Sequence, residues 1–284
     1  MSHGGNRGSF RWISKGFENR ASRDGSSAQK VKCRGHLTGT VMGATFGKRW
    51  RCFAKPRTQM IAPVWTQGKP SHYGERYFAF SPKLGRQVAL SSKLEYERSL
   101  LLEYDSEVSS YCEQPIEAHA LIDGRVCRSR LDFSVTKISG DFFLEEVKYR
   151  SDLVDPAARA HRQLKIQRSW CSDCGYTHQL TTDGDIWRNP VLINSLRTLL
   201  NEFSEQANRV LSEARLVSVE VLDQVRRWPG LSLIDLLDGC PRGTPRELFR
   251  VAIMDLIRTR QLDAALETRR FCPRSPISLF GGRK

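Results

Sequence analysis

The sequence has no long apolar run. None of its stretches approaches the roughly 18 uninterrupted apolar residues that a membrane-spanning helix needs, and the first residues lack the apolar core of a secretion signal. Its eight cysteines are scattered through 284 residues, and a chain of this length can bury a core without a disulfide framework. We therefore expect a cytoplasmic protein with reduced thiols.

The sequence also has no glycine-rich phosphate-binding loop, so any use of ATP would require a partner protein. Acidic residues are in the minority, because 45 Lys and Arg residues stand against 31 Asp and Glu residues and give a net charge of +14. Residues 1–60 hold 13 of the basic residues against Glu18 and Asp24, a local net charge of +11. Such an excess indicates a polyanionic partner, most often nucleic acid.

Residues 1–60 are predicted to be a basic flexible arm, because their first 40 positions are rich in glycine and serine and have no sustained apolar period. Neutralising DNA phosphates is the simplest use of such a segment. A solvated tail that only aids solubility has the same composition, and whether the arm binds DNA or protein stays open.

Residues 61–203 have the pattern of an α+β domain with a small mixed sheet. Asp155 and Pro156 form a helix start, with Asp as N-cap and Pro at the first helical position. The full pattern predicts strands at 76–80, 86–90, 115–122, 125–136, 142–149 and 176–182, and helices at 92–104, 155–170 and 185–203.

Residues 204–284 are predicted to be mainly helical. Thr244-Pro245-Arg246-Glu247 combines a capping box with proline at the first helical position and should open the last helix. Residues 262–267 and 277–280 can then pair as a two-stranded wing. Short helices followed by such a pair predict a winged-helix-like C-terminal domain.

The chemical signal is an aspartate and a Glu-x-Lys motif on neighbouring strands. Leu131, Phe133 and Val135 alternate and should share one face of the sheet, which places Asp132 on the other face. Glu146 lies 14 positions after Asp132, so a turn with an odd number of residues near Ser139 sets the two carboxylates opposite each other. A turn of two residues would break this arrangement.

Lys148 shares the face of Glu146, since the two are two positions apart on one strand, whereas Glu145 should face away. Two carboxylates and an ammonium group suit phosphodiester hydrolysis: oxygen ligands hold Mg²⁺, with Mn²⁺ as a substitute, and the lysine orients water or stabilises charge. Such a short motif is not specific, because a solvated sheet face with a Glu-Lys pair has the same sequence pattern.

Glu95, at the start of a predicted helix, is the best candidate for a third carboxylate. The run Ser92-Lys93-Leu94-Glu95 also fits a capping box, in which Glu95 only bonds back to the Ser92 amide. Glu97 and Glu103 are the alternatives.

These motifs together resemble the TnsA family, the endonuclease subunits of heteromeric transposases. The resemblance covers about residues 76–200, and its ordered motifs are more specific than Glu-x-Lys alone. They comprise Ser92-Lys93-Leu94-Glu95, Leu101-Leu102-Glu103-Tyr104-Asp105, Val108, Tyr111, Gln114-Pro115, Leu131-Asp132-Phe133 and Glu146-Val147-Lys148.

The resemblance implies a restriction-endonuclease-like fold that cuts the 5′ ends of a transposon, while TnsB, a recombinase of the DDE type, cuts and joins the 3′ ends. It implies that Glu95, Asp132 and Glu146 are metal ligands and that Lys148 is the catalytic lysine. It further implies a C-terminal domain that engages DNA and the AAA+ regulator TnsC. Leu131 stands where such nucleases usually have proline, and the position of Glu146 can be glutamine in the family.

Other interpretations remain. His161, Cys171, Cys174 and His178 have a superficially zinc-like spacing, but it matches no common zinc finger, and packing explains these residues adequately. The protein as a whole is alternatively a non-catalytic adaptor of a transposition complex, or a stand-alone nuclease of restriction or repair type. An intact carboxylate and lysine set argues against an adaptor, and a neighbouring recombinase gene would argue against a stand-alone nuclease.

Overall fold

A computed structural model describes residues 63, 76–201, 203 and 205–281. All described residues belong to one compact unit of the chain. The predicted basic arm, residues 1–60, lies outside the described residues. Among the helices of the described ranges, none combines the length and the apolar character that a membrane crossing requires.

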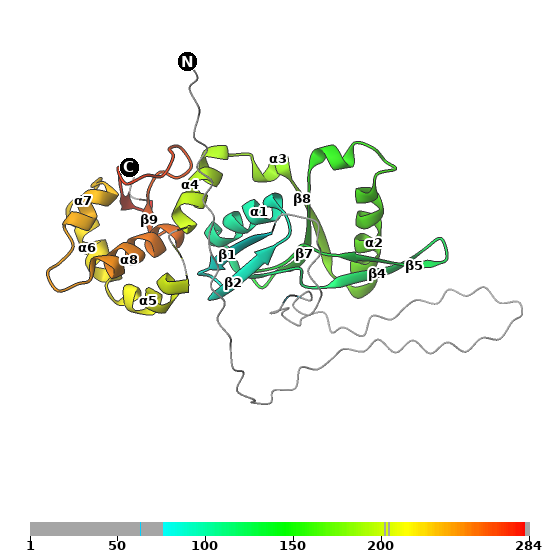
Figure 1. Ribbon diagram of the computed structural model, residues 1–284, viewed down its shortest axis with the longest axis horizontal. Coiled ribbons are helices and arrows are strands. Elements are labelled where there is room, and N and C mark those ends of the chain that lie inside the picture. The colour runs from blue at the N-terminus through cyan, green and yellow to red at the C-terminus, as the bar shows by residue number, and fades with distance from the viewer. Residues whose placement is uncertain (1–62, 64–75, 202, 204, 282–284) are drawn as a thin grey trace, which may run out of the picture. The chain divides into compact units, whose positions relative to one another are not determined.

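The described chain is an α+β fold, as the sequence predicts (Figure 1). The elements of its first part are β1 (Tyr77–Ser81), β2 (Arg86–Leu90), α1 (Lys93–Tyr104), β3 (Val108–Glu113), β4 (Glu117–Ile122), β5 (Arg125–Arg130), β6 (Phe133–Lys137), β7 (Phe142–Lys148), the 3₁₀ helix η2 (Arg150–Leu153), α2 (Arg159–Cys174), β8 (Thr177–Thr182), α3 (Asp183–Ile186) and α4 (Pro190–Leu200). The last part contains α5 (Glu205–Leu216), α6 (Ser218–Arg227), α7 (Leu233–Asp238), α8 (Arg246–Arg258), β9 (Leu262–Asp263) and β10 (Ser278–Leu279).

The central sheet has the strand order β3-β6-β7-β8, in which β7 and β8 are parallel and the other pairs are antiparallel. Each face of this mixed sheet has its own core. Phe133 and Val147 pack with Leu94 of α1, whereas Leu144 packs with Ile166 of α2. The sheet therefore lies between α1 and α2, and successive residues of β7 face these two helices in turn.

The sequence pattern predicts neither strand β3 nor the break between β5 and β6. The predicted single strand 125–136 is two strands: β5 pairs with β4 in a separate ribbon, and β6 belongs to the central sheet. Leu131 packs on the α2 side and Phe133 on the α1 side, so the prediction that they share one face is wrong. The chain changes sheets at Leu131 and Asp132, and strand alternation does not continue across that change.

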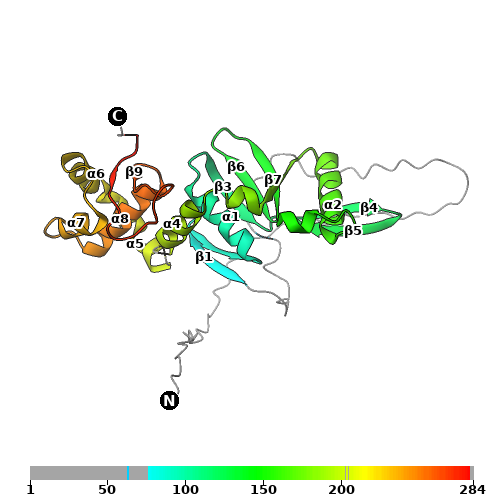
Figure 2. The same cartoon turned by 90° about the horizontal axis from the view of Figure 1, so that it is seen from above.

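The ribbon of β4 and β5 lies against α2 (Figures 1 and 2). Ala118 and Cys127 lie on its apolar face, and together with Leu131 they pack against Ile166 and Cys171 of the helix. Because a two-stranded ribbon is marginally stable alone, this packing is what holds it in place.

Three helix starts differ from the predictions. α2 begins at Arg159, because the Asp155 carboxylate instead closes a tight turn, in which Ala157 N donates to Asp155 Oδ1 at 2.8 Å. The predicted helix 185–203 is divided into α3 and α4, since Asn189 caps a new helix with proline at its first position. The predicted capping box at Thr244 does not form, and Thr244 donates to Glu220 instead.

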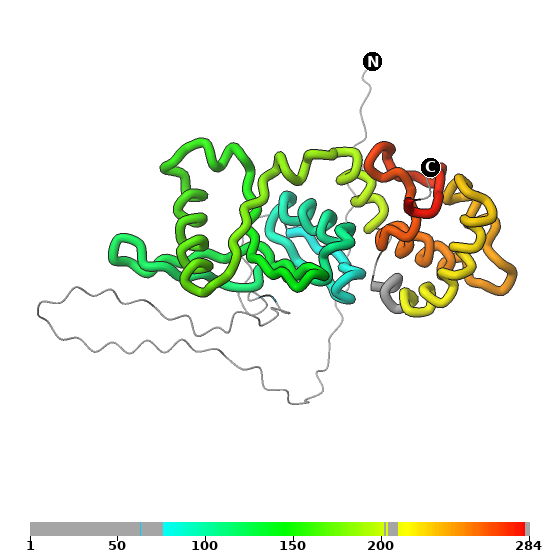
Figure 3. Tube along the Cα trace, turned by 180° about the vertical axis from the view of Figure 1, so that it is seen from behind, coloured from blue at the N-terminus to red at the C-terminus, as the bar shows by residue number. Residues whose placement is uncertain are grey.

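The C-terminal helices gather around α8, which packs against α5, α6 and α7 (Figure 3). The predicted pairing of residues 262–267 with 277–280 is confirmed in shorter form, because β9 and β10 are antiparallel, with Leu262 opposite Leu279. One apolar core joins these helices to Leu100 of α1 and Leu196 of α4.

The described cysteines are mostly free thiols, namely Cys112, Cys127, Cys171, Cys240 and Cys272. Cys174, the last residue of α2, is not one of these free thiols.

Candidate active site

The hairpin of β6 and β7 places Asp132 opposite Glu146. Phe133 pairs with Glu145, and Lys137 N donates to Asp141 O at 2.8 Å, which leaves residues 138–140 in the turn. Gly140 has φ 89°, a left-handed conformation that glycine adopts without strain. The predicted odd turn around Ser139 is thus confirmed, and the same register sets Asp132 against Glu146 one position before β6 begins.

Asp132 is partly buried, and its Oδ2 accepts a hydrogen bond from Val147 N at 2.8 Å. Burial raises the pKa of Asp132 well above its usual range, and the negative charges of Glu146 and Glu95 raise it further. The charge of Lys148 and the Val147 amide oppose this rise. Asp132 therefore lies in an excess of negative charge, where a bound cation would be stabilised.

Glu146 and Lys148 form an ion pair at the end of β7, between Lys148 Nζ and Glu146 Oε1. Burial by itself lowers the pKa of Lys148, but the charges of Glu146 and Asp132 and the hydrogen bond to Glu146 outweigh it and raise the pKa overall. The lysine thus remains protonated at neutral pH. It can neutralise a nearby negative charge, but it cannot accept a proton while so paired.

Glu95 occupies the first turn of α1 and is 7% exposed. Its carboxylate accepts hydrogen bonds from Ser91 N and from Ser92 Oγ, both at 3.0 Å, while Ser92 Oγ caps the helix by accepting from Glu95 N. Burial raises the pKa of Glu95, and the charge of Glu146 contributes to the rise. Glu95 therefore supports the helix start, through Ser91 N instead of the expected Ser92 amide, and also lies within electrostatic reach of Glu146.

The alternative carboxylates are engaged elsewhere. Glu97 is bound by Arg197 at 2.7 Å, and Glu145, on the opposite face from Glu146, by Arg98 at 3.0 Å. Glu103 accepts from the Tyr111 hydroxyl at 2.8 Å and lies 3.9 Å from Arg258. By contrast, neither Glu95 nor Asp132 has a Lys, Arg or His ion-pair partner among the residues that the structure describes. This difference distinguishes Glu95 from Glu97 and Glu103.

Gln167 of α2 binds Glu146 on the face of the sheet that α2 covers, a contact that the sequence analysis missed. It is fully buried, and its Nε2 lies 2.7 Å from Glu146 Oε2 and 3.0 Å from both Ser129 Oγ and Arg130 O. His178 Nε2 lies 3.2 Å from Gln167 Oε1. A signal was present, because Gln167 is the one polar residue in the buried helical stripe Ala160, Leu164, Gln167, Cys171 and Cys174.

Gln114 supports the other side of the site. Its backbone N donates to Asp132 O at 2.7 Å, and its side-chain amide donates to the hydroxyl of Ser91, whose own N–H binds Glu95. Gln114 has φ 42°, which is unusual for a residue other than glycine. Buried Gln114 thus connects the segments that carry Asp132 and Glu95.

No three His, Cys, Asp or Glu side chains gather closely enough to hold a metal ion within the described part of the chain. The expected ligand set of Glu95, Asp132 and Glu146 is therefore not assembled around one point in this structure. The residues of the zinc-like spacing have other contacts, since His161 bonds to Leu153 O and His178 to Gln167.

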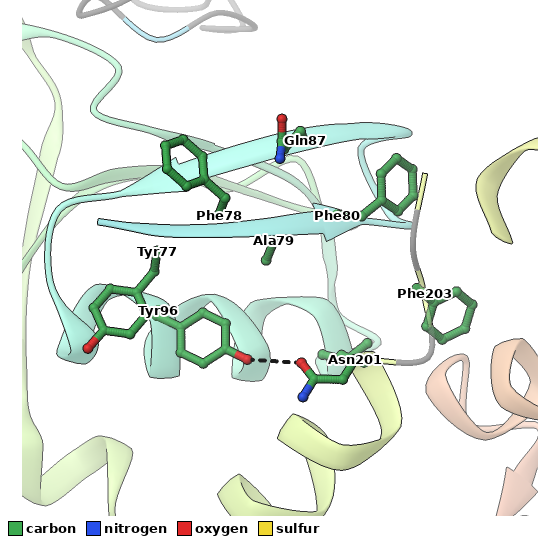
Figure 4. Close-up of a pocket in the computed structure, with 9 residues that line it drawn as sticks. Tyr77, Phe78, Ala79, Phe80, Gln87, Tyr96, Asn201 and Phe203 are labelled. Atoms are coloured by element: carbon green, nitrogen blue, oxygen red, sulfur yellow. Dashed lines mark hydrogen bonds between the residues drawn. The ribbon is translucent and has the colours of Figure 1, made fainter. Parts of the chain in front are cut away.

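A hollow of about 540 Å³ lies elsewhere, beside β1 (Figure 4). The stacked rings of Tyr77 and Tyr96, 5.4 Å apart, form part of its wall with Phe78 and Phe203. Its lining does not include Glu95, Asp132, Glu146 or Lys148.

The chain matches no protein-family model, and no curated protein shows significant similarity to its sequence.

Proposed function

We propose that this protein is a metal-dependent DNA endonuclease that hydrolyses the 5′ ends of a transposon, as the TnsA-type subunit of a heteromeric transposase. The observation that carries the proposal is the register that sets Asp132 against Glu146 at a strand end, with Lys148 beside them and Glu95 in electrostatic contact. Burial and neighbouring charges shift the pKa of Glu95, Asp132 and Lys148, and a cluster of such shifted groups is typical of a catalytic site.

The donor chemistry fits a magnesium ion. Mg²⁺ prefers oxygen ligands and commonly uses one or two carboxylates, with water and substrate phosphate completing the set. Asp132 and Glu146 would supply these carboxylates, and Glu95, which has no cation partner among the described residues, is the third candidate. When bound, the ion would polarise the phosphate and acidify a water molecule.

The side chains around the carboxylates have separate tasks. The protonated Lys148 would offset the negative charge that develops on the phosphate, and the same charge holds Glu146 in place. Gln167 and the Val147 amide fix the orientations of Glu146 and Asp132. We likewise propose that the α+β core is restriction-endonuclease-like and that the C-terminal helices and strands form a winged-helix-like domain.

The proposed partners follow from the resemblance and from the charge. The DNA of the transposon ends would be the substrate, a DDE-type TnsB recombinase would cut the other strand, and an AAA+ TnsC regulator would engage the C-terminal domain. The charge of +11 in residues 1–60 would supply affinity for DNA.

The test is strand-resolved cleavage of donor DNA that carries the transposon ends, with Mg²⁺ and the partner recombinase. We expect 5′ cuts with the wild type, and their loss in Asp132→Ala while DNA binding and folding persist. Glu107→Ala, which removes an exposed carboxylate paired with Lys137, is the matched control and should cut normally.

If the wild type and Asp132→Ala both join the complex but give only 3′ cuts, the protein is an adaptor and the carboxylates are structural. If the wild type cuts DNA equally well without a recombinase, it is a stand-alone nuclease.

A further inference from the structure

Arg130 is the last residue of β5, lies two positions before Asp132 and is exposed. It is anchored twice. Its main-chain oxygen lies 3.0 Å from Gln167 Nε2, and its guanidinium Nη1 donates to Gln114 Oε1 at 3.0 Å. Both glutamines are buried and both touch the carboxylate site, so the guanidinium is held at the rim of that site.

Gln114 holds the Arg130 guanidinium through an unusual backbone conformation. A left-handed backbone at a glutamine costs conformational energy and persists only where the surroundings fix it. Here the strained backbone lets one residue donate to Asp132 O and to Ser91 while its side-chain oxygen still accepts from Arg130. The position of Arg130 is therefore coupled to the segments that carry Asp132 and Glu95.

Arg130 has no carboxylate partner in the described ranges, although the carboxylate of Glu117 is on the neighbouring strand. Glu117 is opposite Arg130 in the ladder of β4 and β5, but its carboxylate lies 3.8 Å from Arg128 and 3.5 Å from His119. Arg128 shares the outer face of β5 with Arg130 and provides a natural comparison, since its charge is partly neutralised.

We propose that Arg130, oriented by Gln114, binds a DNA backbone phosphate next to the one that is cut. The inference rests on the proposed nuclease function and adds a substrate contact to it. A guanidinium fork matches the oxygens of a phosphate, and one held in advance by a buried amide loses less freedom on binding. Gln114 acts as a positioning residue and Arg130 as the phosphate ligand.

The test combines protein variants with neutralised phosphates. Donor duplexes carry one uncharged methylphosphonate at each phosphate around the 5′ cut, and cleavage is measured below DNA saturation. The cleavage rate of the wild type should fall about tenfold when the methylphosphonate replaces one particular phosphate, which is the size expected for the loss of a charged hydrogen bond. Arg130→Ala should cut unmodified DNA about tenfold more slowly, and the same methylphosphonate should cost it nothing further.

Arg128→Ala is the matched control and should keep the full loss at that position. Gln114→Gly keeps the left-handed backbone but removes the amide, so it should reduce the loss at the same position while raising KM more than it lowers kcat. Equal losses in Arg130→Ala and the wild type at every position would overturn the assignment.

A wild type that cuts nothing would refute the nuclease proposal, yet the contact can still be measured. Binding of the same duplexes to Asp132→Ala, and to the double variant with Arg130→Ala, is then followed by fluorescence anisotropy. One position at which only the single variant loses affinity supports the phosphate contact. No such position refutes it independently of cleavage.

Discussion

Replacing Gln167 by leucine tests the support of the active site most directly. Leucine is close in size, so the substitution removes the amide without opening a large cavity. Glu146 Oε2 then loses a donor at 2.7 Å, and Ser129 Oγ and Arg130 O lose neighbours at 3.0 Å, all at a position with no exposed surface. A buried hydrogen bond to a charged group contributes about 1.5–3 kcal/mol, and an unsatisfied neighbour adds a similar cost.

We therefore expect Gln167→Leu to lower the free energy of unfolding by about 3 kcal/mol, measured by denaturant titration of the full chain at pH 7. Below its unfolding temperature the variant should cleave about 10–100-fold more slowly, because Glu146 is no longer oriented. Gln163→Leu is the matched control: it lies on the same helix, is half-buried, and has no side-chain hydrogen bond among the described residues. If both variants have the same stability and activity, the contacts of Gln167 contribute nothing and the reasoning fails.

Three further predictions concern titration and helix capping. Asp132→Asn should stabilise the metal-free protein by about 1 kcal/mol at pH 7, because the folded state raises the pKa of Asp132 and so disfavours its charged form. Calorimetry measures this gain in stability. The gain should shrink as the pH falls towards 4, where the native aspartate takes up a proton. Burial lowers the pKa of Lys83 to about 8, so wild-type stability relative to Lys83→Met should rise between pH 8 and 10.5, where only the unfolded lysine stays charged; a flat difference in denaturation midpoints would contradict this. Ser92→Ala should lower the free energy of unfolding by about 1 kcal/mol, because it removes the N-cap of α1, whereas Ser92→Thr keeps the hydroxyl and should preserve stability; denaturant titration measures both.

The hairpin that carries the site could be predicted from sequence because each part of it is local. The even separation of Asp132 and Glu146 and the turn near Ser139 leave few possible registers, and the observed one follows from the length of the turn. The N-cap at Ser92 is local as well, and the expected start of α1 is confirmed. Where a few neighbouring residues decide a conformation, pattern and spacing are sufficient.

The break at Leu131 and Asp132 could not be predicted in this way. Leu131 leaves the alternating pattern because it packs against α2, a helix that begins almost thirty residues later. The bond from Gln167 to Glu146 likewise joins residues that only the folded chain brings together. Strand β3 was missed because its residues, VSSYCE, alternate poorly, and its place in the sheet depends on pairing with β6.

Helix α1 carries Glu95 in its first turn and Glu103 in its last, about 12 Å apart along the axis. Glu103 is buried beside Tyr111 of the sheet and Arg258 of α8. Leu94 of α1 belongs to the core beneath the central sheet, whereas Leu100 belongs to the core of the C-terminal helices. Glu95, the carboxylate that stands apart from the hairpin, therefore lies on the helix that the two cores share.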